Sequence, residues 1–298
     1  MKKMLSFAMA LVMCLSLAAC GGGNTSQTSG SSGSAGGSSS GGAGGQTGSG
    51  STSQPAAESD LEYVKGKGTL VVGITDFDPM DYRDANGEWI GFDADMAKAF
   101  ATSLGVEAEF VEITWDYKVM ELNAKNIDCV WNGMTLNDEV MAAMDTSVPY
   151  SLNAQVLVVP ADKAADFQAL TSLEGLSVAV ESGSAGEDAA EALGANVVPV
   201  AKQADTLLEV SAGTSDAAVI DLLMAGAMIG EGTSYENLTH TLNLNDIQGL
   251  ESEEYGVGFR QGSDLVAAYN QFWADSVADG TALATGTTYG VQESLLLD

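Results

Sequence analysis

Short apolar runs and amphipathic stretches alternate along the chain from residue 68 onward. Residues 68–75 are apolar and rich in β-branched side chains, which predicts a buried strand. Met96, Phe100 and Leu104 then recur at four-residue spacing, which predicts a helix that Asp93 can cap. Further strands are predicted at 106–110, 127–131, 155–159, 177–181, 197–200 and 217–220, and further helices around 119–122, from Thr135 or Asn137, and at 187–193, 203–212 and 222–229. This alternation is typical of α/β layers with largely parallel sheets.

The N-terminus has the pattern of a secretory signal peptide. Lys2 and Lys3 precede an apolar run over 4–17, and small residues lead directly into Cys20. The run is shorter than a transmembrane helix needs. The Leu-Ala-Ala-Cys ending resembles the bacterial lipobox, which implies cleavage before Cys20, lipidation of its sulfur and an extracytoplasmic, lipid-anchored protein. An ordinary cleaved signal that happens to contain a cysteine is the alternative.

Residues 21–60 are predicted to form a flexible tether. Of the 34 residues from 21 to 54, 24 are glycine or serine and none is charged, so this stretch cannot bury a core. About 238 residues follow the tether, more than one α/β core usually needs, and two lobes are expected.

Composition narrows the possible functions. The chain has 41 acidic and 11 basic residues, a formal charge of −30, which argues against nucleic acid and anionic lipid surfaces as partners. One histidine and three cysteines leave little for zinc sites, histidine-based triads or a disulfide framework. Cys129 is expected to be a buried inert thiol and His240 a surface residue. We therefore expect no cofactor and no metal.

Several motifs together resemble bacterial solute-binding proteins of family 3. Residues 68–79 are similar to the opening strand and ligand loop of that family, and 86–97 resemble its G-x-x-x-G-F-D-x-D signature. Further similar segments, in the same order, are 115–116, 122–128, 132–135, 149–150, 173–176, 183–184 and 255–258. The likeness covers roughly residues 61–280, and chance is an implausible source.

The resemblance implies a receptor of an ABC importer, most often for polar amino acids, with the importer's permease as its partner. It implies the type II periplasmic-binding-protein fold, in which two α/β lobes, each a mostly parallel sheet flanked by helices, close over one ligand. Lobe 1 is expected at 61–153 and 256–298, lobe 2 at 154–255, and two hinge strands near 154–159 and 254–259. We expect a monomer.

The resemblance also assigns binding roles. Phe77 and Trp115 match aromatic residues on opposite sides of the ligand, where they can pack on an aliphatic or cationic group. Asp221 matches the acid that binds the ligand's α-ammonium, and a carboxylate buried at a strand end needs a positive partner. Glu181 also ends a predicted strand, and it either faces the same cleft or is solvated.

The carboxylate end of the ligand is less clearly provided for. Asn132, Gly133 and Thr135 match polar groups that bind the ligand's main-chain end, and the turn at Ser184 and Ala185 can hold a carboxylate on backbone N–H groups. The family's arginine, four residues into the helix after 135–136, is Val140 here. The only arginines, Arg83 and Arg260, are not evident substitutes. Either the 133–135 amides and the helix dipole hold the carboxylate alone, or the ligand lacks that group.

Two other functions remain open. Some relatives with this fold dehydrate small carboxylic acids, which requires an acid or base in the pocket and a clamp for carboxylates. A sensory lipoprotein with an altered ligand or a protein partner is the other alternative. The retained aromatic pair and Asp221 favour an amine-bearing small solute, most simply an amino acid.

Overall fold

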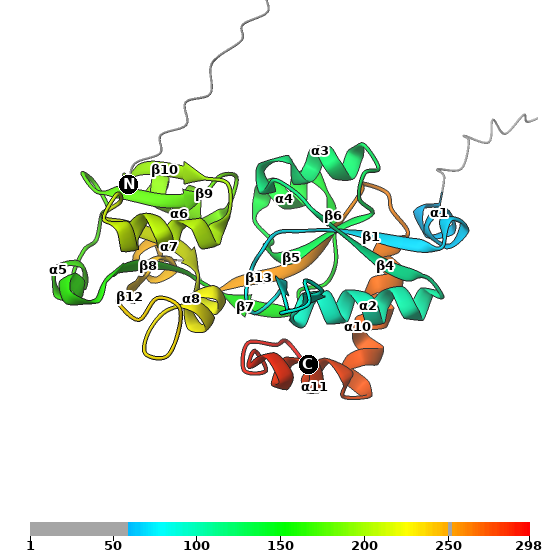
Figure 1. Cartoon of the computed structure of the whole chain (residues 1–298). Helices are drawn as coiled ribbons and strands as arrows, with labels where there is room; N and C mark the ends of the chain where they lie inside the picture. Colours follow the sequence, from blue (N-terminus) through cyan, green and yellow to red (C-terminus); the bar gives the residue numbers. More distant parts are fainter. Residues whose placement is uncertain (1–58, 250–251) are drawn as a thin grey trace, which may run out of the picture. The chain divides into compact units, whose positions relative to one another are not determined.

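The computed structural model describes residues 59–249 and 252–298 (Figure 1). The predicted signal peptide, Cys20 and residues 21–58 lie outside this part of the chain. The tether predicted for 21–60 ends earlier than expected, because Ser59 caps helix α1 (Asp60–Lys67) by accepting a hydrogen bond from the backbone N–H of Glu62 at 3.0 Å. Acidic residues in the first turn of α1 and lysines in its last turn also suit the helix dipole.

The first lobe is built on a six-stranded sheet. Its strand order is β4-β1-β5-β13-β6, with β7 paired to β13. The bounds are β1 Thr69–Ile74, β4 Glu107–Glu112, β5 Cys129–Thr135, β6 Asp145–Thr146, β7 Ser151–Asn153 and β13 Glu253–Phe259. Helix α2 (Phe92–Leu104) packs on β1, β4 and β5, and α10 (Leu265–Ala278) and α11 (Thr281–Tyr289) pack on α2. Smaller elements are η1 Trp115–Tyr117, α3 Lys118–Asn123, α4 Asp138–Ala143 and the hairpin of β2 Tyr82–Arg83 and β3 Trp89–Ile90.

The second lobe is built on a five-stranded sheet in the order β10-β9-β11-β8-β12. The bounds are β8 Gln155–Pro160, β9 Ser177–Glu181, β10 Asn196–Val200, β11 Ala217–Asp221 and β12 Leu238–Asn243. Helices α6 (Ala185–Ala192) and α7 (Gln203–Ala212) pack on β9 and β11. The remaining elements are η2 Ala161–Lys163, α5 Ala164–Phe167, α8 Leu222–Met228 and α9 Leu244–Gln248. Figure 1 shows α6 and α7 beside this sheet.

Both sheets are mixed, whereas the alternating pattern predicted mostly parallel sheets. In the first lobe β1 pairs in parallel with β4 and β5, but β13 runs antiparallel to β5. In the second lobe β9 pairs in parallel with β10 and β11, but β8 runs antiparallel to β11. Strands β8 and β13 enter their sheets from the other lobe rather than through a helical crossover, so nothing constrains them to the parallel direction.

The chain crosses between the two sheets twice. Ala154 lies between β7 of the first sheet and β8 of the second, and the return falls between Gly249 and Glu253. Strand β13 therefore belongs to the first sheet from Glu253 on, slightly before the lobe boundary predicted at 255/256. The division into 61–153 with 256–298 and 154–255 stays a prediction in its detail.

Three residues near the first lobe's strands had expected local roles, and the structure confirms some of these roles and corrects others. Asp93 does not cap α2: Gly91 precedes the helix, and the Asp93 carboxylate is buried. Helix α4 begins at Asp138, and Asn137 caps it by accepting from the Val140 N–H at 2.9 Å, so Thr135 is the last residue of β5. Cys129 is fully buried, which raises the pKa of its thiol.

His240 is exposed on β12 of the second lobe, as expected. None of the described helices is long and apolar enough to span a membrane.

Candidate ligand-binding site

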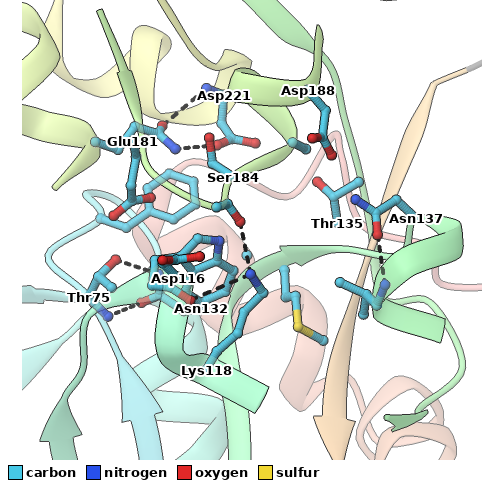
Figure 2. Close-up of a pocket in the computed structure, with 18 of the residues that line it drawn as sticks. Thr75, Asp116, Lys118, Asn132, Thr135, Asn137, Glu181, Ser184, Asp188 and Asp221 are labelled. Atoms are coloured by element: carbon cyan, nitrogen blue, oxygen red, sulfur yellow. Dashed lines mark hydrogen bonds between the residues drawn. The ribbon is translucent and has the colours of Figure 1, made fainter. Parts of the chain in front are cut away.

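A cleft of about 830 Å³, including the part open to solvent, is lined by residues of both lobes. Its walls come from the loop after β1, η1, β5 and α4 of the first lobe, and from the turn between β9 and α6 and the end of β11 of the second (Figure 2). The structure brings together all eight residues predicted to bind ligand: Phe77, Trp115, Asn132, Gly133, Thr135, Ser184, Ala185 and Asp221. Their contact with a ligand stays a prediction.

Two nearly buried aromatic side chains form the apolar walls. Phe77 is 2% exposed and Trp115 is 6% exposed. Phe77 packs edge-on against Tyr255, with ring centroids 6.4 Å apart. Gly133 makes this packing possible, because its φ is +54° and a Cβ there would lie 2.4 Å from Cε1 of Phe77.

The polar groups of Asn132 and Gly133 are partly used inside the protein. The Asn132 amide accepts from the Thr75 N–H at 2.8 Å and donates to the Thr75 hydroxyl at 2.7 Å, joining β5 to the end of β1. The Gly133 N–H donates to Asp93 at 2.7 Å. One amide N–H of Asn132 remains for a ligand, but the Gly133 N–H is already engaged.

In the turn before α6, too, more of the backbone N–H groups already have acceptors within the protein than the sequence suggested. The Gly183 N–H donates to the Glu187 carboxylate at 2.7 Å, while the Glu187 N–H donates to the Ser184 hydroxyl oxygen at 3.1 Å, a reciprocal capping arrangement. The Ser184 N–H donates to the Glu181 carbonyl at 3.2 Å. The Ser184 hydroxyl hydrogen and the Ala185 N–H have no acceptor among the described residues. They are the donors this turn offers an anion.

Asp221 is buried at the end of β11 and is held by neutral donors. Its carboxylate accepts from Gln155 at 3.0 Å, Gln203 at 2.6 Å and Tyr255 at 2.7 Å, and also from the Asn153 amide. The expected requirement for a positive partner is therefore met in part by neutral side chains. Burial raises the pKa of Asp221 to about 6, and the nearby Glu253 carboxylate adds to the rise.

Thr135 sits beside that second carboxylate. Its hydroxyl donates to Glu253 at 3.1 Å, and Glu253 also accepts from Gln155 at 2.9 Å. The Gln155 amide thus lies between Asp221 and Glu253, at the point where β8 follows the first crossing between the lobes. The hydroxyl that was expected to face the ligand is oriented toward Glu253.

Glu181 does face the cleft, which settles the alternative that the sequence left open. It ends β9, the parallel neighbour of β11, and its side chain is 4% exposed. One of its carboxylate oxygens has no partner among the described residues. Burial raises the pKa of Glu181 to about 8, and the neighbouring Asp221 contributes to this rise. A buried, partly unpartnered carboxylate in a cleft is suited to a cationic ligand group.

Val140 lines the cleft without offering any polar side-chain atom. It is 5% exposed and packs in one apolar cluster with Trp115 and Met134. Neither arginine replaces the missing guanidinium. Arg260 is buried against Asp60 at 3.0 Å and bonds two backbone carbonyls, while Arg83 stacks over Trp89 at 4.1 Å.

Sequence reasoning missed Lys118, which also lines the cleft. The signal was its position three residues after Trp115, which places both side chains on one side of a helical turn. The acidic lining residues Asp116, Glu139 and Asp188 were missed as well; they add to Asp221, which was predicted, and Glu181, which was a candidate. The cleft is thus strongly acidic, with one basic side chain among the described lining residues. Among residues 59–249 and 252–298, no group of three or more histidine, cysteine, aspartate or glutamate side chains is placed to hold a metal ion.

The fold and cleft define a two-lobe binding protein of the periplasmic-binding-protein type. Residues 70–292 match the bacterial extracellular solute-binding proteins, family 3, and the chain belongs to this family. It is similar to the L-cystine-binding protein TcyJ of Escherichia coli, with 29% identity over 77% of this chain and 85% of that protein. The arginine-binding extracellular protein ArtP of Bacillus subtilis is 29% identical over 69% of this chain and 80% of that protein.

Solved structures agree with this assignment. A crystal structure of a mutant of ArgBP from T. maritima superposes with a TM-score of 0.70 and 31% identity, over 78% of this chain and 99% of that chain.

An enzyme is also among the relatives that match by sequence: the cyclohexadienyl dehydratase of Pseudomonas aeruginosa is 30% identical, but over only 48% of this chain and 54% of that protein. Binding proteins therefore cover more of the chain than the enzyme does.

Proposed function

We propose that this protein is the extracytoplasmic receptor of an ABC importer and that it captures an α-amino acid, or a related amine, between its lobes. The observation that carries this proposal is the pair of buried carboxylates, Asp221 and Glu181, at the ends of neighbouring strands in one cleft. A bound cation favours the ionised form of such buried carboxyl groups and replaces the hydration that they have lost. A cystine-binding and an arginine-binding protein among the relatives support an amino acid as the ligand.

The remaining cleft residues have complementary roles. The rings of Phe77 and Trp115 pack against the ligand's carbon chain and exclude water from the cationic group. The Ser184 hydroxyl and the Ala185 N–H donate to the ligand's carboxylate, and Asn132 supplies its remaining amide hydrogen. Gly133 and Thr135 act mainly by shaping the wall, since their polar groups are engaged with Asp93 and Glu253.

Placement at the membrane follows from the predicted N-terminal segments. We propose that a lipid on Cys20 anchors the protein on the outer side of the cell membrane. The glycine- and serine-rich sequence after Cys20 would link the lobes to this anchor. Mass spectrometry of the membrane fraction tests this directly, because Cys20→Ser should abolish both the lipid mass and the membrane association.

Ligand-induced stabilisation tests the binding role. The chain without residues 1–20 should melt at a higher temperature with one α-amino acid from a panel of amino acids, amines, peptides and carboxylates. A ligand present at a hundred times its Kd adds about 2.7 kcal/mol to the free energy of unfolding. Asp221→Ala should lose the shift, and Asp162→Ala, at an exposed position of the second lobe, should keep it. The absence of a shift with every compound would favour the sensory-lipoprotein alternative.

We propose binding without turnover, although one observation gives the dehydratase reading some support. The Glu181 carboxyl, with a pKa of about 8, is largely protonated at neutral pH and lies in the cleft, as a general acid would. NMR spectra of each bound carboxylic acid, recorded over hours with the protein, decide between the two functions. If the wild type dehydrates a bound carboxylic acid and Glu181→Gln does not, the protein is an enzyme.

A further inference from the structure

Lys118 is the one basic residue among the described residues that line the cleft, and its ammonium group is held from three sides. Its Nζ donates to the Gly183 carbonyl of the second lobe at 2.8 Å and lies 3.5 Å from the Trp115 carbonyl. It also lies over the Trp115 ring, 4.8 Å from the centroid. The residue is 9% exposed, so this cation is nearly buried.

The position of this ammonium group relates it to the missing arginine. Trp115, which carries the Lys118 ammonium on its face, packs in the same apolar cluster as Val140. Burial lowers the pKa of the Lys118 ammonium, and the carboxylate of Glu139, the residue before Val140, opposes this shift. On the other side, Gly183 immediately precedes Ser184, whose hydroxyl is one of the remaining donors of that turn. Lys118 thus lies between the start of α4 and the start of α6.

We propose that the Lys118 ammonium binds the α-carboxylate of the ligand, the role that the family resemblance gives to an arginine at position 140. This inference rests on the proposed function. An ammonium group has three N–H donors, and the contact to Gly183 uses one of them well. Since the 3.5 Å contact to the Trp115 carbonyl is weak, the other two are left for a ligand oxygen.

Charge balance in the cleft supports the same assignment. An amino acid brings a carboxylate into a cleft already lined by Asp116, Glu139, Glu181, Asp188 and Asp221. Without a cation nearby, those of these groups that are ionised would repel it. Fewer backbone donors are left than expected, because the Gly133 and Gly183 N–H groups are engaged with Asp93 and Glu187. Lys118 supplies the only full positive charge that the described lining offers.

Lys118 has a second, simpler explanation: it only holds the two lobes together through Gly183. The two roles differ in one measurable respect. A contact between lobes stabilises the closed form for every ligand, so its loss weakens all ligands by the same factor. A carboxylate clamp acts only on ligands that carry a carboxylate.

The test compares an amino acid with the amine that lacks its carboxylate. The pairs are arginine and agmatine, lysine and cadaverine, and histidine and histamine; the pair used is the one whose amino acid raises the melting temperature most. Kd values are measured by calorimetry for the wild type, Lys118→Gln and Lys118→Arg. Lys163→Gln serves as the charge-matched control, because Lys163 is exposed in η2 of the second lobe, outside the cleft.

The wild type should bind the amino acid at least about 10-fold more tightly than its amine. Lys118→Gln should weaken the amino acid about 10- to 100-fold, the range for a lost charge-assisted hydrogen bond, and leave the amine within about 3-fold. Lys118→Arg should restore most of the preference for the amino acid, and Lys163→Gln should change neither ligand.

Equal weakening of both ligands in Lys118→Gln would overturn the inference and leave Lys118 as a contact between lobes. Equal affinity of the wild type for amino acid and amine would also overturn it. These results would leave the amino-acid receptor intact. If no amino acid of the panel binds the wild type while an amine without a carboxylate does, both the clamp and the α-amino-acid assignment fail.

Discussion

The Asp93 carboxylate accepts a hydrogen bond from the backbone N–H of Gly133 at 2.7 Å, deep behind the cleft wall. Asp93 lies in the first turn of α2, and Gly133 lies in β5, so this bond joins the helix to the strand that forms the cleft floor. Tyr150 donates its hydroxyl to the same carboxylate oxygen at 2.7 Å. The shape of the wall at Gly133 thus depends on a buried acid that does not itself line the cleft.

We expect Asp93→Ala to lower the free energy of unfolding by about 2 kcal/mol. The substitution leaves the Gly133 N–H and the Tyr150 hydroxyl buried without their acceptor, and each such group costs about 1–3 kcal/mol, offset in part by removing a carboxylate that burial disfavours. Urea unfolding followed by tryptophan fluorescence measures the change. Asp162→Ala, at an exposed site, is the control, and equal stability of the two variants would contradict this role for Asp93.

Gly133→Ala should act mainly through a clash with the cleft wall, and less through backbone strain. The new Cβ would lie 2.4 Å from Phe77 and 3.1 Å from Tyr255, so the Phe77 ring must move out of its place in the wall. We expect a loss of about 2–3 kcal/mol of stability and at least about 10-fold weaker ligand binding, measured by chemical unfolding and calorimetry.

Gly213→Ala separates the clash from the backbone effect. Gly213 ends α7 with φ +73° and has no atom within 4 Å of a built Cβ, so an alanine there meets only the left-handed backbone penalty of about 1 kcal/mol. This control should bind ligand as the wild type does. If Gly133→Ala behaved in the same way, Phe77 would not depend on the glycine.

Much of the fold could be predicted because hydrophobic spacing determines local structure. Helix α7 has the bounds predicted for 203–212, and β9 those predicted for 177–181. The direction of β13 could not be predicted, since it depends on how the chain returns from the other lobe. The family resemblance located the cleft residues, but it could not show that Gly133 and Gly183 already donate to Asp93 and Glu187.

The roles of individual buried polar side chains were the hardest to predict. Glu181 and Lys118 stand outside the residues that the family comparison assigns, and their importance appears only when burial and partners are known. The same holds for Gln203, which donates to Asp221 from the start of α7. A single sequence shows which residue types are present, while the pairing of buried charges requires the tertiary arrangement.

Without ligand, the protein should be less stable at pH 8 than at pH 5. Burial raises the pKa of Asp221 to about 6, of Asp93 to about 7 and of Glu181 to about 8. The unfolded chain releases these protons near its ordinary carboxyl pKa of about 4, whereas the folded chain keeps them longer. Stability from these groups is therefore fully present below about pH 4 and is lost as the pH rises through each folded-state pKa.

Glu181→Gln should isolate one of these contributions. The amide cannot ionise, so the variant should lose less stability than the wild type between pH 5 and 8, with a difference on the order of a few kcal/mol. Thermal melts at several pH values, without ligand, give the comparison. A wild-type stability that increases over this range, or an unchanged slope in the variant, would show that Glu181 is not protonated in the folded protein.

An exposed ion pair between the lobes should contribute little to affinity. Lys202, which precedes α7 of the second lobe, pairs with Glu112 at the end of β4 of the first lobe, and both side chains are more than a third exposed. Ligand release requires the lobes to separate, which breaks this pair. Such pairs contribute about 0.2–1 kcal/mol, so Lys202→Gln should weaken binding by only about 2- to 5-fold at low salt.

Salt distinguishes this contact from one inside the cleft. Screening at about 0.5 M salt should weaken wild-type binding toward the Lys202→Gln value and leave the variant nearly unchanged, because the exposed pair is the group that salt reaches. Glu112→Gln is the matched variant, since it removes the partner and should have the same effect, with no further loss in the double variant. A loss of more than about 10-fold, or one that salt does not reduce, would mean that Lys202 contacts the ligand itself.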